Sequence, residues 1–188
     1  MKKIEFESLP VLENDLIIAQ PLKEDDFERL FKVASDPLIW EQHPNKERYK
    51  REVFKVFFEG AIESKGAFLV TDKSTNKTIG SSRYYDYNID ESCVTIGYTF
   101  IAKDHWGSKY NRALKSLMLD HAFEYVDTVY FHVGAENIRS QKAMIKLGAV
   151  KHGEIEMRYH GEEIKLNFIY KMDKEMWKEI KTLFKSIQ

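Results

Sequence analysis

The sequence predicts an α/β fold of the α+β kind, in which helices cover both faces of one mixed sheet. Segments with β-type alternation follow one another between residues 67 and 101, and helical periodicity recurs before and after them. No repeat, low-complexity tract or linker-like cluster divides the 188 residues. We therefore expect one domain over residues 14–172, with an N-terminal tail over 1–13 and a C-terminal helix over 173–188 packed on it.

The N-terminal part predicts one strand followed by two helices. Residues 16–19 form a short apolar run that ends near a proline, and a helix over 25–34 follows it. Two X-Pro steps predict a loop over 36–44. A helix over 46–64 is indicated by apolar side chains at helical spacing.

Three strands are expected next, over residues 67–71, 79–87 and 93–101, with turns between them. In the third strand, bulky residues alternate with the small residues Thr95, Gly97 and Thr99. One face of that strand therefore belongs to the core, and the other leaves room for something to lie against it.

The remaining segments alternate between helix and strand. A helix follows the loop over 106–112 and ends near Val126, and Asp173 caps the last helix. A hairpin turn at His160-Gly161 is predicted to join the last two strands. The other expected elements are a strand over 128–133, a helix over 137–147, and strands over 150–159 and 163–170.

The composition excludes several classes of function. Lys and Arg number 29 against 30 Asp and Glu, so the basic excess of a nucleic-acid or anionic-membrane binder is missing. We expect no membrane span, and glutamates interrupt the N-terminal region that a signal peptide would need. Cys93 is the single cysteine, and the six histidines lack short ligand spacing, so no metal is expected. A cytoplasmic protein is the expectation.

Two segments can carry chemistry. Gly107, Lys109 and Arg112 lie where a strand passes through a tight loop into a helix, and such a helix N-terminus suits phosphate. The alternative is an ordinary turn with basic surface residues. Asn137 and Ser140 lie one helical turn apart after the next strand and can bind an amide-bearing ligand, or Asn137 merely caps its helix.

Together these segments resemble the GNAT superfamily of acyl-CoA-dependent N-acyltransferases, near its ribosomal-protein-alanine and small-molecule branch. The similarity covers residues 14–172. It rests on the strand Ile96-Gly97-Tyr98, the loop Trp106-Gly107, and a helix with Asn137, Ser140, Ala143 and Leu147-Gly148.

The resemblance implies a twisted, mostly antiparallel sheet whose fourth and fifth strands, 93–101 and 129–133, splay into a V. Acyl-CoA would lie in the gap with its pantetheine along Phe100 and Ile101, and Ser140 would be a general acid near the thioester sulfur. Asn137 would contact the pantetheine or orient local water. Arg139, Lys142 or Lys146 would meet the adenosine phosphate. The pyrophosphate would lie on the loop amides of Gly107, Ser108, Lys109, Tyr110, Asn111 and Arg112, and Trp106 would anchor this cofactor-binding loop to the core.

The chain departs from the family pattern at three positions. Lys109 and Asn111 replace the small residues that let pyrophosphate touch the backbone, so either the Lys109 ammonium assists binding or the loop takes another path. Thr95 stands where many members carry a catalytic glutamate and cannot act as a base.

On the acceptor side, Glu41, His43 and Asp86 are candidate proton acceptors, although each is also compatible with an ordinary loop or surface role. Arg83 and Tyr85 share one strand face and would line the acceptor pocket or simply pack across strands. Trp40 is a further candidate for substrate binding, since it would cover the mouth of the cleft, or it would simply pack against its own loop.

These observations predict transfer of an acetyl or other acyl group from acetyl-CoA to a primary amine within a ternary complex. The acceptor would be a protein N-terminus or a small molecule, and the enzyme a monomer or homodimer. Two alternatives stay open, a catalytically inactive acyl-CoA sensor and a protein-interaction domain.

Overall fold

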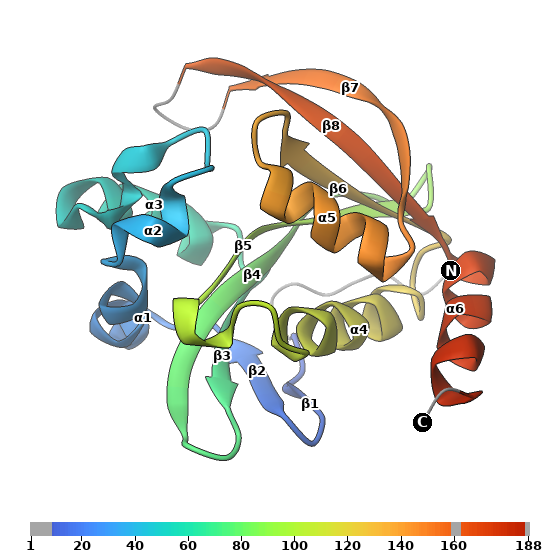
Figure 1. Cartoon of the computed structure of the whole chain (residues 1–188), viewed down its shortest axis with the longest axis horizontal. Coiled ribbons are helices and arrows are strands. Elements are labelled where there is room, and N and C mark those ends of the chain that lie inside the picture. Colours follow the sequence, from blue (N-terminus) through green and yellow to red (C-terminus); the bar gives the residue numbers. More distant parts are fainter. Residues whose placement is uncertain (1–8, 159–162, 187–188) are drawn as a thin grey trace.

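A computed structural model describes residues 9–158 and 163–186 of the chain, which fold around one eight-stranded sheet (Figure 1). The strand order is β1-β2-β3-β4-β5-β6-β8-β7, and the β5–β6 pair is parallel while all other neighbours are antiparallel. The strands are β1 (Leu12–Glu13), β2 (Ile17–Pro21), β3 (Ala67–Asp72), β4 (Lys77–Asn88), β5 (Cys93–Ile101), β6 (Thr128–Gly134), β7 (Val150–Arg158) and β8 (Ile164–Asp173).

Helices cover both faces of this sheet, because the strand side chains alternate between two apolar clusters. On β3, Leu69 packs against α1, α2 and α3, whereas Phe68 and Val70 face the cluster that includes α4. The helices are α1 (Phe27–Ala34), α2 (Pro37–Trp40), α3 (Arg51–Glu63), α4 (Tyr110–Ala122), α5 (Ile138–Leu147) and α6 (Lys174–Ser186).

Strands β5 and β6 separate after a short parallel contact. They pair only over residues 93–95 of β5 and 128–130 of β6. Beyond these pairs, β6 stays paired with β8 as far as Gly134, and β5 stays paired with β4 as far as Ile101. The predicted mixed sheet with a V-shaped splay is therefore confirmed.

Two β-bulges interrupt the pairing of β4 with β5. The register shifts between Ser81 and Arg83, opposite Tyr98, and again between Tyr85 and Asn88. Tyr98 and Asp86 both have positive φ, at 52° and 48°, as expected for residues that a bulge displaces from the regular ladder. The first bulge lies where β5 leaves β6.

Several predicted boundaries differ from the structure. The loop over 36–44 contains α2, since Asp36 caps a short helix with Pro37 at its first turn. The helix over 46–64 is divided at Lys50 into a 3-10 turn and α3. The helix expected to end near Val126 stops at Ala122.

At the two ends, tertiary pairing extends the sheet. Leu12–Glu13 pairs with β2, so strand structure begins inside the expected tail. Asp173 is the last residue of β8, and its carboxylate accepts a hydrogen bond from Thr128 Oγ1 at 3.0 Å. The turn predicted at His160-Gly161 lies outside the described residues.

Candidate active site

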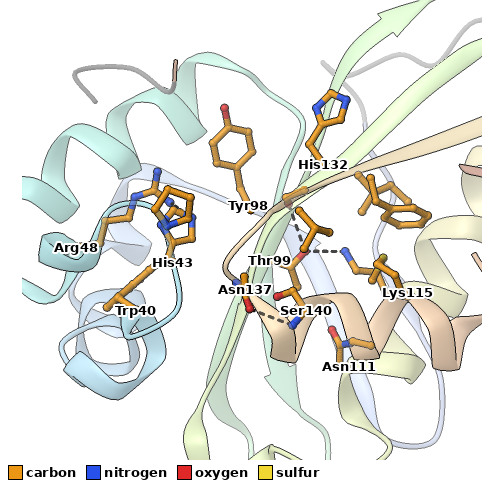
Figure 2. A pocket seen from close by; sticks show the side chains of 18 residues that line it. Trp40, His43, Arg48, Tyr98, Thr99, Asn111, Lys115, His132, Asn137 and Ser140 are labelled. Carbon is orange, nitrogen blue, oxygen red and sulfur yellow. Dashed lines mark hydrogen bonds between the residues drawn. The ribbon is translucent and has the colours of Figure 1, made fainter. Parts of the chain in front are cut away.

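A pocket of about 110 Å³ lies where β5 and β6 part (Figure 2). Its walls come from β5, β6, α4, α5 and the segment between α2 and α3. The lining side chains and backbone belong to Trp40, His43, Pro44, Arg48, Ile96, Gly97, Tyr98, Thr99, Asn111, Lys115, Phe131, His132, Val133, Gly134, Asn137, Ser140, Ala143 and Met144. Trp40 and Met144, which lie 104 positions apart in sequence, thus share one cavity.

The loop before α4 leaves backbone amides open. Gly107 has φ of 68°, and no atom lies within 4 Å of where a Cβ would be. Within the described residues, no hydrogen bond occupies the N–H groups of residues 107–111. Together with the α4 dipole, this arrangement can hold an anion.

Trp106 and Arg139 tie this loop to the rest of the fold. The Trp106 indole N–H donates to the Ile101 carbonyl at 2.8 Å, and the Arg139 guanidinium lies 3.8 Å from the indole centroid. Arg139 also donates to the Ile39 carbonyl at 3.1 Å. The Ile101 carbonyl and the Arg139 guanidinium, both predicted to bind acyl-CoA, therefore have protein partners.

Tyr110 points away from the pocket, toward the end of β3. Its hydroxyl donates to Asp72 Oδ2 at 3.1 Å, and His105 lies 3.3 Å from the same oxygen. Burial would raise the pKa of Asp72, but hydrogen bonds from Ser74, His105 and Tyr110 outweigh it and hold the pKa well below its usual range. This buried carboxylate fixes the start of α4.

Most other loop candidates lie on the surface. Ser108, Lys109 and Arg112 are exposed, as is Lys142 on α5. Ser108 donates its hydroxyl to the His105 carbonyl. Asn111 differs from them, because it lines the pocket.

Asn137 and Ser140 meet at the pocket wall, as Figure 2 shows. Asn137 Oδ1 accepts a hydrogen bond from the Ser140 amide at 3.0 Å, so Asn137 is the N-cap of α5. Both side chains also line the cavity. The capping and ligand-facing interpretations of Asn137 are therefore compatible.

The acceptor-side candidates divide into two groups. Trp40 and His43 line the pocket. Trp40 is 2% exposed, and its ring centroid lies 5.1 Å from that of Phe100, with the two ring planes tilted by 49°. Burial and the Arg48 cation, 3.1 Å from His43 Nε2, hold the pKa of His43 well below its usual value. His43 is thus neutral at physiological pH.

Arg83 and Tyr85 lie beside the pocket rather than in its wall. Arg83 donates to the carbonyls of Gly60 and Phe57 at 3.0 and 3.3 Å. Tyr85 packs over Gly97, where a Cβ would come within 2.8 Å of its ring, and its hydroxyl lies 3.0 Å from His132 Nδ1. Both side chains therefore support the β4–β5 region.

Glu41 and Asp86 are exposed and do not line the pocket, so the structure does not bring these two candidate bases to it. Cys93 is buried at the other end of β5, and burial raises the pKa of its thiol.

Lys115 is a pocket residue that the sequence reasoning missed. Its side chain is 3% exposed, and Nζ donates to Thr99 Oγ1 at 2.6 Å. Burial lowers the pKa of Lys115 to about 7. The available signal was its spacing, since Lys115 lies three and seven residues before Met118 and Ala122 on the apolar face of α4.

The sequence matches the family model of the acetyltransferase (GNAT) domain over residues 16–150. The chain therefore belongs to the GNAT family and is an acyltransferase. No curated protein sequence matches the chain.

Solved structures share the fold. A GCN5-related N-acetyltransferase from Brucella melitensis has a TM-score of 0.81 at 16% identity, covering 94% of this chain and 84% of that one. Spermidine N-acetyltransferase from Vibrio cholerae, in complex with CoA and spermine, has a TM-score of 0.66 at 17% identity, covering 87% and 99%. The ribosomal-protein-S5-alanine acetyltransferase from Vibrio fischeri has a TM-score of 0.65 at 17% identity, covering 89% and 98%.

Two further observations concern the described residues alone. No helix among them has the length and apolar character needed to cross a lipid bilayer. Their His, Cys, Asp and Glu side chains form no group of three or more that could hold a metal ion.

Proposed function

We propose that the protein transfers an acyl group, with acetyl as the simplest case, from acyl-CoA to a primary amine by direct attack in a ternary complex. The observation that carries the proposal is the splay of β5 from β6. The pocket in that splay is lined by Asn111 from the first turn of α4, so the cavity reaches the start of the helix whose preceding loop leaves its amides open.

Acyl-CoA fits this path by its chemistry. The amides of residues 107–111 and the Lys109 ammonium suit the diphosphate, and the edge of β5 from which β6 departs beyond Thr95 suits the amides of pantetheine. Asn137 and Ser140 would then face the thioester end, with Ser140 within reach of the sulfur. Phe100 would contribute backbone only, because its side chain packs on Trp40.

The tetrahedral oxyanion needs a donor, and the bulge at Tyr98 supplies a candidate. A bulged residue leaves the ladder, so the backbone amides around Tyr98 and Thr99 can face the acyl carbonyl. We place the acceptor amine on the side of Trp40 and His43, where the pocket wall comes from another part of the chain.

The first test is a thermal shift with acetyl-CoA followed by thiol release with a panel of amines. Ligand at 100 times its Kd should stabilise the protein by about 2.7 kcal/mol. Absence of any shift would favour a protein-interaction domain. Binding without turnover on any amine would favour an acyl-CoA sensor. We further expect a cytoplasmic enzyme, monomeric or homodimeric, which sedimentation would check.

A further inference from the structure

The buried amine of Lys115 has no role in the proposal above. It lies on the inner face of α4 and lines the pocket opposite Ser140 of α5 (Figure 2). Its Nζ donates to Thr99 Oγ1 at 2.6 Å and to Ser82 Oγ at 3.4 Å, and lies 5.5 Å from the Phe131 ring centroid. The amine is therefore held at a fixed place in the cavity.

Stability does not explain a lysine at this position. A buried lysine is usually paired with a carboxylate, but among the described residues Lys115 has no ion-pair partner and no Asp or Glu lines the pocket. A methionine of similar length would occupy the same space without the cost of burying a cation. An uncompensated amine in a cleft is the pattern of a functional group.

We propose that Lys115 is a catalytic residue, the general acid that protonates the thiolate leaving the acyl donor. The proposal rests on the proposed acyl transfer. The acceptor nitrogen attacks the thioester carbonyl carbon, a C–N bond forms, and the C–S bond breaks with its electron pair going to sulfur. The proton on Lys115 Nζ moves to that sulfur, and solvent later returns a proton to the neutral amine, equal to the one that the acceptor nitrogen gives up.

The direction of proton transfer favours an acid over a base. Burial lowers the pKa of Lys115 to about 7, whereas an alkyl thiol has a pKa of about 8.5 and an alkylammonium about 10.4. A proton therefore passes downhill from Lys115 to the thiolate. Deprotonating an ammonium acceptor with Lys115 would run uphill by about three pKa units.

The two histidines that face the pocket do not supply this acid. Arg48 and His43 approach from the segment after α2, Tyr98 comes from β5, and His132 comes from β6. Burial lowers the pKa of both His43 and His132 and so favours their neutral forms. Ser140 of α5 can donate a hydrogen bond to sulfur, but its hydroxyl is too weak an acid to release the proton at neutral pH.

The test compares Lys115→Met with Lys178→Met, which removes an exposed lysine on α6. Thiol release from acetyl-CoA is measured with an accepting amine, or with water if no amine is accepted, because hydrolysis breaks the same C–S bond. We expect kcat of Lys115→Met to fall about 100-fold, with the acetyl-CoA thermal shift unchanged. Wild-type kcat should decline above about pH 7, because Lys115 then loses the proton that it donates. This decline should be absent in Lys115→Met.

The leaving group gives a sharper readout. An acetyl thioester of thiophenol releases a thiolate that is a much weaker base and needs no acid. Lys115→Met should therefore approach the wild-type rate on that donor. An unchanged kcat, or an equal loss on both donors, would overturn the assignment.

Thr99→Val serves as the test if Lys115→Met does not fold. It removes the hydroxyl that accepts a hydrogen bond from Lys115 Nζ, so the pH at which kcat begins to decline should change. An unchanged pH profile of kcat would overturn the assignment. Failure of wild type to show a thermal shift with acetyl-CoA overturns the proposed function instead. If wild type and Lys115→Met turn over at the same rate, the role assigned to Lys115 is wrong, while the proposed acyl transfer still stands.

Discussion

Two buried basic side chains lie close to β5, one on each face of the sheet. Arg83 of β4 faces α3, where it donates to two carbonyls and lies 4.1 Å from the centroid of the Tyr98 ring. Lys115 of α4 faces the pocket and donates only to hydroxyls. Both are less than 10% exposed, at 7% and 3%.

The difference between them lies in proton affinity. Burial lowers the pKa of Arg83 to about 10 and that of Lys115 to about 7. Arg83 therefore keeps its charge at neutral pH and joins β4 to α3, whereas Lys115 exchanges a proton within the physiological range. Arg83 therefore supports the fold on the α3 side of the sheet, whereas on the α4 side we propose a chemical role for Lys115.

The largest expected effect concerns stability against pH. Native Lys115 loses its proton near pH 7, but the unfolded chain holds it up to about pH 10.4, so the unfolded state binds more protons between these values. The free energy of unfolding of wild type should therefore rise relative to that of Lys115→Met by about 2 kcal/mol from pH 7 to pH 9. Urea unfolding at several pH values measures this, and Lys178→Met should parallel wild type. If the difference in free energy of unfolding between wild type and Lys115→Met stays constant with pH, then Lys115 keeps its proton as Arg83 does.

The second effect tests Arg83 in the same way. Arg83→Met leaves the part-buried carbonyls of Phe57 and Gly60 without their charged donor, so we expect the free energy of unfolding to fall by about 2 kcal/mol. The loss should stay constant from pH 6 to pH 9. Arg51→Met, which removes an exposed pair with Glu28, should cost about 0.5 kcal/mol or less. A loss that varies with pH would contradict a purely supporting role.

The third effect is expected at Asn137. Asn137→Ala removes the N-cap of α5 and should cost about 1 kcal/mol together with a fall in turnover. Asn137→Asp keeps an acceptor for the Ser140 amide but loses the amide donor. Restored stability with turnover still reduced would separate the ligand-facing role from the cap, while wild-type turnover in both variants would leave capping alone.

The smallest effect is expected at Lys109. Because its ammonium is exposed beside the α4 N-terminus, Lys109→Ala should weaken acetyl-CoA about threefold at low salt and less at high salt. Calorimetric titration at two ionic strengths measures this, with Lys178→Ala as the control. Unchanged affinity at low salt would show that the backbone amides suffice.

The strands and helices near the cleft followed from local pattern. The segments 93–101 and 137–147 were predicted because alternation and helical spacing repeat over enough residues to determine the element. α2 was missed because its four residues give too short a pattern beside two prolines. The division at Lys50 was missed because apolar spacing continues across it.

The sequence predicted only some of the residues that line the pocket. Asn137, Ser140, Asn111, Trp40 and His43 do come together in the pocket. Glu41 and Asp86 do not, and the bulge that displaces Asp86 breaks the strand alternation that sequence reasoning assumed. A bulge depends on the partner strand, so one strand's sequence does not reveal it.

The sequence by itself determined the order of the elements, the family and the loop before α4, since each depends on neighbouring residues. Only the tertiary structure decided that β5 and β6 part after three pairs and that Lys115 faces the resulting gap. The physical reason is desolvation: the pKa of an amine depends on what surrounds it in space, and for Lys115 those surroundings come from β4, β5, β6 and α5.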